Sequence, residues 1–314
     1  MARYVRVSSI SYAGVGGNGE DRKQKAVEGA LALIDRAACD RPDFIVLPET
    51  FNGLGCGHEE WLKSGEAIPG PTFDALAAKA RQHRTYVICP VLEKRDGRLY
   101  NTAALIGRDG QFIGRYDKVH PTINEIEGGV TPGVEMPVFE TDVGRVGMAI
   151  CFDLNFRDVA EGLSRNGAEV VFFPSMYRGG LSLSVWAFEF SFWMVSATPR
   201  ENSAIVNPLG QWLAQSFMYC PIISRRINLD SAVLHIDYNH RQYDAMKAKY
   251  GDQIQLDILA PEAVFMLTCD HPTKTVRDII REFDLELRTD YFARANRVRE
   301  AALKGGVPAS AAAS

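Results

Sequence analysis

Short apolar segments alternate with segments of helical spacing through the first part of the chain. Residues 4–12 alternate enough between polar and apolar side chains to predict an opening strand, and 44–47 form a continuous apolar run typical of a strand buried on both faces. Between them, the apolar residues of 21–38 recur at the spacing of a helix. A second helix over 72–83 leads into another apolar strand over 86–92. This order of elements predicts an α/β protein.

Two turn signals follow the last of these strands. Asp96-Gly97 and Asp109-Gly110 are dipeptides typical of tight hairpin turns, and strand-like segments over 99–106 and 112–116 flank them. Together they predict an antiparallel meander, so the sheet is expected to be mixed. The meander ends directly before Lys118.

The second half of the chain repeats part of this pattern. An apolar run over 143–150 ends in Cys151, at a predicted turn from a strand to a helix. The helix over 157–165 closes at a glycine and leads into the segment 170–175, an apolar strand that reaches Pro174, just as Pro48 follows the strand over 44–47. This repetition indicates two related halves, with a site between them.

Glu49, Lys118 and Cys151 therefore each follow a predicted strand. Each residue also has an ordinary explanation. A cysteine in an apolar strand is often an inert core residue, and a lysine in a loop is usually solvated. A glutamate after a strand can cap the next loop, and its position alone supports capping and chemistry equally. The three residues carry more weight as a set.

The composition excludes several classes of protein. A chain of 314 residues can bury a sizeable core, as one large domain or as two smaller ones. Its net charge of -4, with acidic and basic residues interspersed, predicts neither a nucleic-acid nor a membrane partner. The six cysteines include no C-x-x-C pair, which indicates neither a disulfide framework nor a zinc site. We therefore expect a soluble cytoplasmic protein with reduced thiols.

Three short motifs surround the candidate residues: Leu47-Pro-Glu49, Arg115-Tyr-Asp-Lys118-Val-His and Gly147-Met-Ala-Ile-Cys151-Phe-Asp. They closely resemble the three signature motifs of the nitrilase superfamily of carbon-nitrogen hydrolases, and the resemblance covers roughly residues 3 to 227. It implies a four-layer αββα sandwich with mixed sheets, whose subunits pair into an αββα-αββα homodimer or a higher homo-oligomer. It also implies that neither a metal ion nor an organic cofactor takes part.

The resemblance implies a role for each residue. Glu49 resembles the general base of the family, Lys118 the cation over the developing oxyanion and Cys151 the nucleophile. Many members of the family have a second glutamate in the loop after the lysine. Glu125 matches that position best, and Glu127 is the alternative.

Elementary chemistry supports these roles. A free thiol has a pKa of about 8.5, so attack near neutral pH needs a neighbouring base or cation. Glu49 can accept the proton of Cys151 and later return it to the departing ammonia or amine. Lys118 and the backbone N–H of Phe152 can stabilise the negative charge that grows on the carbonyl oxygen.

The residues around the cysteine favour an amidase. Cys151-Phe-Asp153 is similar to the aliphatic amidases and omega-amidases of the superfamily, whereas Lys118-Val-His-Pro-Thr122 is similar to nitrilases. The sequence thus predicts a thiol amidohydrolase that cleaves a small non-peptide amide through an acyl-enzyme and releases ammonia or an amine. The alternatives are a nitrilase, an N-carbamoyl hydrolase, an enzyme that passes the acyl group to an amine, and a non-catalytic interaction protein.

Two further segments have predicted roles. The loop after the strand over 170–175 faces the site if the two halves pair, so Tyr177 and Arg178 are candidate substrate-binding residues. Arg178 is suited to an acidic substrate, and a solvated surface arginine is the alternative. The aromatic stretch over 186–193 is predicted to lie at a subunit interface.

The domain boundaries follow from the extent of the resemblance and from composition. We expect 1–270 to form the carbon-nitrogen hydrolase domain and 271–304 to form a helical extension at a subunit interface. A lid that recognises an anion is the alternative role for this carboxyl-terminal part. The tail over 305–314 has no periodic apolar face and is predicted to be disordered.

Overall fold

The computed structural model describes residues 2–305, which divide into two compact units. The larger unit spans Tyr4–Ile227, and the smaller unit begins at Asn228 and includes the first residues of the chain. The predicted disorder of the tail concerns residues that lie, except for Gly305, outside the described part.

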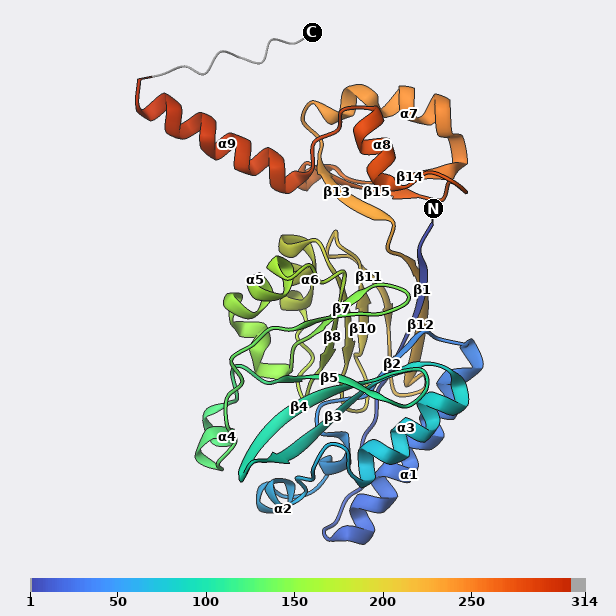
Figure 1. The fold of residues 1–314 in the computed structure, drawn as a ribbon, viewed down its shortest axis with the longest axis vertical. Helices are drawn as coiled ribbons and strands as arrows, with labels where there is room; N and C mark the ends of the chain where they lie inside the picture. Colours follow the sequence, from blue (N-terminus) through green and yellow to red (C-terminus); the bar gives the residue numbers. More distant parts are fainter. Residues whose placement is uncertain (1, 306–314) are drawn as a thin grey trace. The chain divides into compact units, whose positions relative to one another are not determined.

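The larger unit contains two six-stranded sheets, and the first has the strand order β12-β1-β2-β3-β4-β5 (Figure 1). Strands β1, β2 and β3 are parallel, and β4 and β5 continue the sheet as the antiparallel meander that the turn signals predict. The bounds are β1 Tyr4–Ile10, β2 Phe44–Val46, β3 Tyr86–Arg95, β4 Arg98–Ile106, β5 Phe112–Asp117 and β12 Ile222–Asn228.

The second sheet has the order β11-β10-β9-β8-β7-β6 and repeats the plan of the first. Strands β7, β8 and β9 are parallel, and β10 and β11 are antiparallel. The bounds are β6 Val138–Glu140, β7 Arg145–Met148, β8 Val170–Pro174, β9 Trp193–Ala197, β10 Ala204–Val206 and β11 Trp212–Gln215. The two halves suggested by the sequence therefore have matching strand topology.

Helices cover the outer face of each sheet, so the larger unit has four layers in the order αββα (Figure 1). The first sheet is covered by α1 (Glu20–Ala37) and α3 (Pro71–His83), and the second by α5 (Arg157–Arg165) and α6 (Leu181–Phe190). The sheets face each other through rings such as Phe44 and Phe172, whose centroids are 5.1 Å apart. The predicted αββα architecture with mixed sheets is confirmed.

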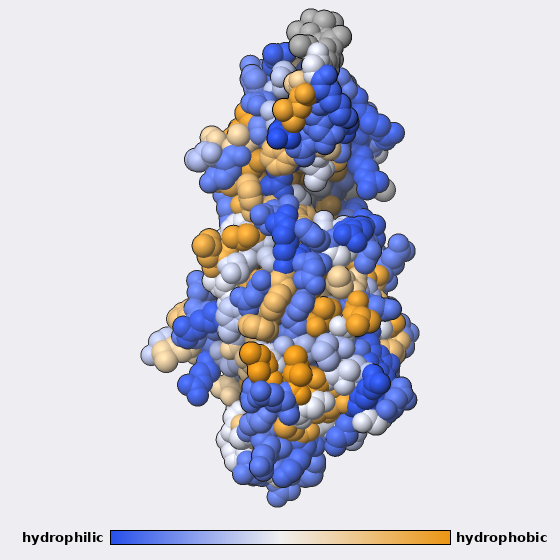
Figure 2. All heavy atoms as spheres, turned by 90° about the vertical axis from the view of Figure 1, so that its left-hand side faces the viewer, coloured by the Kyte–Doolittle hydropathy of each residue, from blue (hydrophilic) through white to orange (hydrophobic). Residues whose placement is uncertain are grey.

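Burial of apolar side chains explains these elements. Every residue of β8 is buried, as its unbroken apolar sequence requires, and α1 turns its small and branched residues inward at helical spacing. Trp186, Phe192 and Trp193 of the predicted interface stretch are buried in the core of their own chain. Figure 2 shows that hydrophobic residues on one face form separate patches among hydrophilic ones.

The smaller unit is built on a three-stranded antiparallel sheet with the order β13-β15-β14. Its elements are β13 Ser231–His235, α7 Tyr243–Tyr250, β14 Ile254–Leu259, β15 Val264–Cys269, α8 Val276–Glu282 and α9 Arg288–Leu303. Its own apolar core joins the sheet to residues of α7 and α8. The structure thus divides the chain at residue 228 and not at 270, since a cut at 270 would separate α8 from the strand it packs against.

None of the helices within residues 2–305 combines the length and the apolar character that a membrane span requires.

Candidate active site

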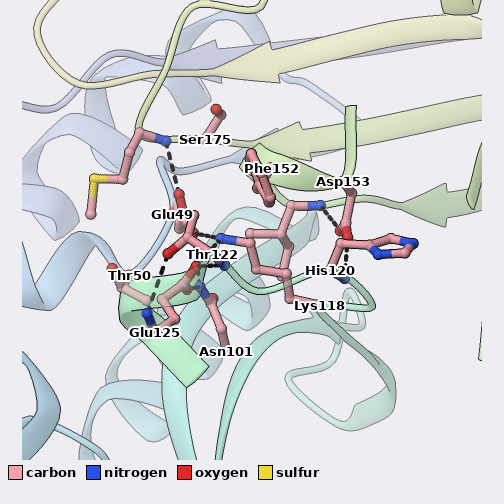
Figure 3. A network of polar contacts seen from close by, with 12 residues as sticks. Glu49, Thr50, Asn101, Lys118, His120, Thr122, Glu125, Phe152, Asp153 and Ser175 are labelled. Carbon is pink, nitrogen blue, oxygen red and sulfur yellow. Dashed lines mark hydrogen bonds and ion pairs between the residues drawn. The ribbon is translucent and has the colours of Figure 1, made fainter. Parts of the chain in front are cut away.

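The three predicted residues lie together at the ends of strands from both sheets. Glu49 follows β2, Lys118 follows β5 and Cys151 follows β7. The Nζ atom of Lys118 lies 2.8 Å from Oε1 of Glu49 and 2.8 Å from Oε2 of Glu125 (Figure 3). All four side chains are buried and line one cavity. The first sheet contributes the charged groups, and the second contributes the thiol.

Contacts from both sheets fix the carboxylate of Glu49. The next residue, Thr50, has a φ of 40°, so the chain turns sharply at the end of β2. The indole N–H of Trp61 donates to Oγ1 of Thr50 at 2.9 Å and holds this turn. From the other sheet, the backbone N–H of Met176 donates to Oε2 of Glu49 at 2.9 Å.

Of the two glutamates predicted after Lys118, Glu125 is the one that contacts it. Glu125 lies on the short helix α4 (Ile123–Glu127), which begins with a capping box. In this box the N–H of Thr122 donates to Oε2 of Glu125 at 2.7 Å, which directs the carboxylate toward Lys118. Glu127 is exposed. Glu125 is therefore the second glutamate of the site.

Asn101 on β4 belongs to the site, although the sequence analysis did not identify it. It is fully buried, and its Nδ2 atom donates to Oε1 of Glu49 at 2.7 Å and to Oε1 of Glu125 at 2.8 Å. Its backbone carbonyl accepts from the N–H of Lys118. One feature of the sequence could have identified Asn101. It is an uncharged polar residue in a predicted strand whose later residues are apolar, and the meander that contains this strand ends directly before Lys118.

Cys151 lies at a strained turn. It has a φ of 49° and begins a short 3₁₀ turn that extends to Asn155. Such left-handed geometry is uncommon for a residue other than glycine and is often found at functional sites. Phe152 is the second residue of this turn, where a backbone N–H has no acceptor within the helix. The turn thus places the thiol of Cys151 next to the backbone N–H of Phe152 in the chain.

Asp153 holds this turn against the loop that follows Lys118. One of its oxygens accepts from the N–H of Ile150 at 2.8 Å and from the hydroxyl of Tyr116 at 2.7 Å, and the other accepts from the N–H of His120 at 2.8 Å (Figure 3). Burial raises the pKa of Asp153 to about 6, although these hydrogen bonds act to lower it. In the sequence, Asp153 is part of the motif around Cys151 but has no predicted role.

The surroundings raise the pKa of both the thiol and the ammonium. Burial, followed by the charge of Glu49, raises the pKa of Cys151 to about 12, and Lys118 only partly offsets this. Burial acts to lower the pKa of Lys118, but the charges of Glu49, Cys151 and Glu125 outweigh burial and raise it. At neutral pH the thiol is therefore protonated beside a charged ammonium, so its reaction requires transfer of the proton to a base.

The cavity beside these residues has a volume of about 390 Å³, a size that suits a small molecule. Its wall combines apolar side chains and glycines with a few polar groups. It is lined by Glu49, Gly53, Leu54, Gly55, Cys56, His58, Trp61, Lys118, Thr122, Asn124, Glu125, Cys151 and Met176.

The two predicted substrate-binding residues do not line this cavity. Arg178 is two-thirds exposed, and its guanidinium pairs with Glu201 at 3.0 Å. This is the surface arginine that the sequence analysis kept as the alternative. Tyr177 is half-buried, and burial and the charge of Cys151 raise its pKa to about 12. Among residues 2–305, no group of three or more His, Cys, Asp or Glu side chains could hold a metal ion.

Comparisons with known proteins agree with this geometry. Residues 13–229 match the family model described as carbon-nitrogen hydrolase. The chain is 27% identical over 234 residues to omega-amidase NIT2 of Xenopus tropicalis, covering 66% of this chain and 84% of that protein.

Solved structures share the fold. Nit3 of Saccharomyces cerevisiae, described as a member of branch 10 of the nitrilase superfamily, has a TM-score of 0.64 at 23% identity, covering 72% of this chain and 90% of Nit3. A mutant amidase from Nesterenkonia sp. in complex with butyramide has a TM-score of 0.63 at 16% identity, covering 78% of this chain and 97% of the amidase. Since the family model spans more than half of the chain and includes Glu49, Lys118 and Cys151, the protein belongs to the carbon-nitrogen hydrolase family.

Proposed function

We propose that this protein is an amidase that hydrolyses a small non-peptide amide through an acyl group on Cys151. The observation that carries the proposal is the meeting of a protonated thiol, a carboxylate and an ammonium at one end of a cavity of about 390 Å³. These are the nucleophile, the base and the cation that attack on an amide needs.

In the first half of the reaction, the sulfur of Cys151 adds to the amide carbonyl and Glu49 takes the thiol proton. Negative charge develops on the carbonyl oxygen, where the ammonium of Lys118 and the N–H of Phe152 stabilise it. The tetrahedral intermediate then breaks its carbon–nitrogen bond, and Glu49 returns the proton to the departing ammonia or amine. The product is a thioester on Cys151.

In the second half, water attacks the thioester. Glu49 takes a proton from this water, the same two donors stabilise the second oxyanion, and the carbon–sulfur bond breaks. The thiol regains a proton and the carboxylic acid leaves. Glu125 contacts Lys118 but not Cys151, so its role in both halves is to hold the ammonium in place.

The choice of an amide rests on the residues after the nucleophile and on the names of relatives. The sequence Cys151-Phe-Asp153 is similar to amidases, and the chain resembles proteins described as an omega-amidase and as an amidase bound to butyramide. Nitrile hydrolysis and decarbamoylation would use the same thiol and base and remain the alternative reactions.

A panel of substrates tests the proposal. The enzyme is incubated with short-chain amides, the corresponding nitriles and N-carbamoyl compounds, and ammonia and carbon dioxide are measured. We expect ammonia from amides and an acyl adduct on the peptide that contains Cys151. If only nitriles or only carbamoyl compounds are hydrolysed, the protein is a nitrilase or an N-carbamoyl hydrolase and not an amidase. Equal behaviour of wild type and Cys151→Ala, without an adduct, would refute hydrolysis.

Assembly and cellular location belong to the same proposal. The family resemblance supports a homodimer or a higher homo-oligomer, with the helices after residue 270 at a subunit interface. All six cysteines are free, which suits a reducing compartment such as the cytoplasm. Light scattering of the full chain, and of a chain that ends at residue 287 and so lacks α9 but keeps α8, would show whether this last helix contributes to assembly.

A further inference from the structure

A buried amide side chain connects the two carboxylates of the site. The Nδ2 atom of Asn101 reaches Glu49 at 2.7 Å and Glu125 at 2.8 Å, and Nζ of Lys118 reaches the same two carboxylates at 2.8 Å each. Figure 3 shows these four side chains pointing toward one another. They form a closed ring in which two donors, one neutral and one charged, each bridge two acceptors.

The chemistry of the ring fixes the orientation of the amide. If the group were turned over, Oδ1 of Asn101 would face two carboxylates and both hydrogen bonds would be replaced by repulsion. In the orientation observed, Oδ1 has no hydrogen-bond partner among the described residues. An unpaired buried acceptor is unfavourable for stability. The site therefore keeps an amide here despite a stability cost.

A neutral donor has a specific advantage at this position. With Glu49 and Glu125 ionised and Lys118 protonated, the ring carries a net charge of about -1. A second cation would neutralise it and make Glu49 a weaker base. The amide holds Oε1 of Glu49 without adding charge, while Oε2 is held by the N–H of Met176.

We propose that Asn101 is a positioning residue that sets the orientation of the carboxylate pair, and so controls proton transfer between Cys151 and Glu49. The proposal rests on the amidase function above and deepens it. Burial acts to raise the pKa of Glu125. Lys118 and, to a smaller extent, a hydrogen bond from Asn101 act to lower it, and the net pKa is lowered. Removal of Asn101 should therefore let the pair take up a proton at higher pH.

The main experiment measures kcat and KM from pH 4 to 9 for wild type, Asn101→Leu and Asn101→Asp with the best amide of the panel. Both replacements have nearly the shape of asparagine but lack its two donors. We expect kcat to fall about 100-fold while KM changes little, because positioning acts on the chemical step. In Asn101→Leu the acidic limb of the kcat profile should move up by about one pH unit.

Asn52 offers a matched control. It is also fully buried, its Nδ2 atom donates to the buried carboxylate of Glu66 at 3.1 Å and to Thr72 at 3.3 Å, and its Oδ1 atom likewise has no partner among the described residues. Asn52→Leu should lower the melting temperature as Asn101→Leu does, but leave the acidic limb in place. A shift of the same size in both variants would overturn the proposal.

A second readout does not depend on turnover. The rate at which iodoacetamide alkylates Cys151 is followed against pH by mass spectrometry of the peptide that contains it. We expect the alkylation profile of Asn101→Leu, but not that of Asn52→Leu, to move to higher pH. If wild type hydrolyses no amide and this shift still occurs, the amidase function fails and the role of Asn101 stands. Unshifted profiles in folded Asn101→Leu would make Asn101 a purely structural residue.

Discussion

The two sheets of the larger unit carry two buried polar clusters at equivalent places, and the clusters differ in charge. The charged cluster consists of Glu49, Asn101, Lys118 and Glu125, and the hydroxyl cluster consists of Ser11, Thr198, Ser203 and Ser216. Lys118 directly follows β5 and donates its backbone N–H to Asn101, and Ser216 directly follows β11 and donates to Ser203 in the same way.

The hydroxyl cluster is satisfied within itself. The hydroxyl of Ser11 lies 2.6 Å from that of Ser203 and 2.7 Å from that of Ser216, and Thr198 donates its N–H to Ser203 at 2.9 Å. A hydroxyl both donates and accepts, so these neutral groups can be buried at low cost.

The charged cluster shows the opposite balance. It buries three ionisable groups, leaves the oxygen of Asn101 unpaired and adjoins a cavity. Buried ion pairs rarely add stability, because desolvation offsets their attraction. The same order of strands therefore supports a stabilising cluster in one sheet and a reactive cluster in the other.

The strongest test of the comparison is Glu49→Gln, which removes the base and keeps the shape. We expect kcat to fall about 1,000-fold and the melting temperature to fall as well, since glutamine places an NH₂ group where one carboxylate oxygen now accepts a hydrogen bond. Steady-state kinetics and thermal unfolding measure both effects. A loss of less than tenfold would show that another group accepts the thiol proton.

Lys118→Met should have the next largest effect on activity and a larger effect on stability. Loss of one oxyanion donor lowers kcat about 100-fold, and two unpaired buried carboxylates destabilise the fold by about 3 to 5 kcal/mol. Burial tends to raise the pKa of Glu125, but Lys118 and the other donors lower it, so wild type gains stability from this group above its unfolded pKa.

The destabilisation by Lys118→Met should therefore be largest near neutral pH. It should shrink as the pH falls toward about 4, where the unfolded carboxylate becomes protonated. Urea unfolding at pH 7 and pH 4 checks this sign. A difference that grows on acidification would contradict the assigned charges.

Asp153→Asn tests the connection between the sheets, because Asp153 links the Cys151 turn to Tyr116 and the N–H of His120. An asparagine places an NH₂ group where one carboxylate oxygen now accepts, so the turn should shift and kcat should fall about tenfold.

Asp153 also predicts a pH dependence of stability. Its pKa of about 6 is raised by burial, so the folded state holds this proton more tightly than the unfolded state. The stability of wild type relative to Asp153→Asn should fall by up to about 3 kcal/mol as the pH rises from about 4 to about 6, and then stay level. Denaturant unfolding of both proteins across this pH range checks this prediction. A difference in the free energy of unfolding that does not change with pH would show that the pKa of Asp153 is not raised.

Ser11→Ala tests the hydroxyl cluster. It leaves Ser203 and Ser216 without one partner and should cost about 1 to 2 kcal/mol of stability, while kcat stays within twofold. A large loss of kcat at unchanged stability would mean that the two clusters are not functionally distinct.

Arg178→Ala should have the smallest effect. The pair with Glu201 is exposed and lies outside the residues that line the cavity, so we expect less than a twofold change in kcat or KM for neutral and acidic amides alike. A selective rise of KM for acidic amides would restore the substrate-binding role predicted from the sequence.

The sequence predicted those parts of the site that depend on local order. Glu49, Lys118 and Cys151 could be found because each stands in a short contiguous motif that resembles one of the family, directly after a strand that its own residues define. Asn101 could not be assigned, because its role depends on the register of β4 against β3 and β5, which brings one strand position between two distant glutamates. Its contacts are set by pairing and not by neighbours in the chain.

The incorrect and missing assignments have similar causes. Arg178 follows a strand of the right sheet, but the direction of its side chain is set by Glu201, a tertiary partner. The sequence predicted a domain boundary at residue 270, whereas the two compact units divide at residue 228. Apolar periodicity alone does not show that β15 pairs with both β13 and β14. In each case the deciding contact joins residues far apart in sequence.

The outer strands β6 and β12 reach their sheets from different places in the chain. β6 precedes the second half but pairs with β7 of the second sheet, whereas β12 ends the second half but pairs with β1 of the first sheet. Residues 138–215 supply all six strands of the second sheet, whereas the first sheet is completed only by a strand that lies beyond them in the chain. A chain that ends before β12 would therefore leave the edge of β1 without a partner strand.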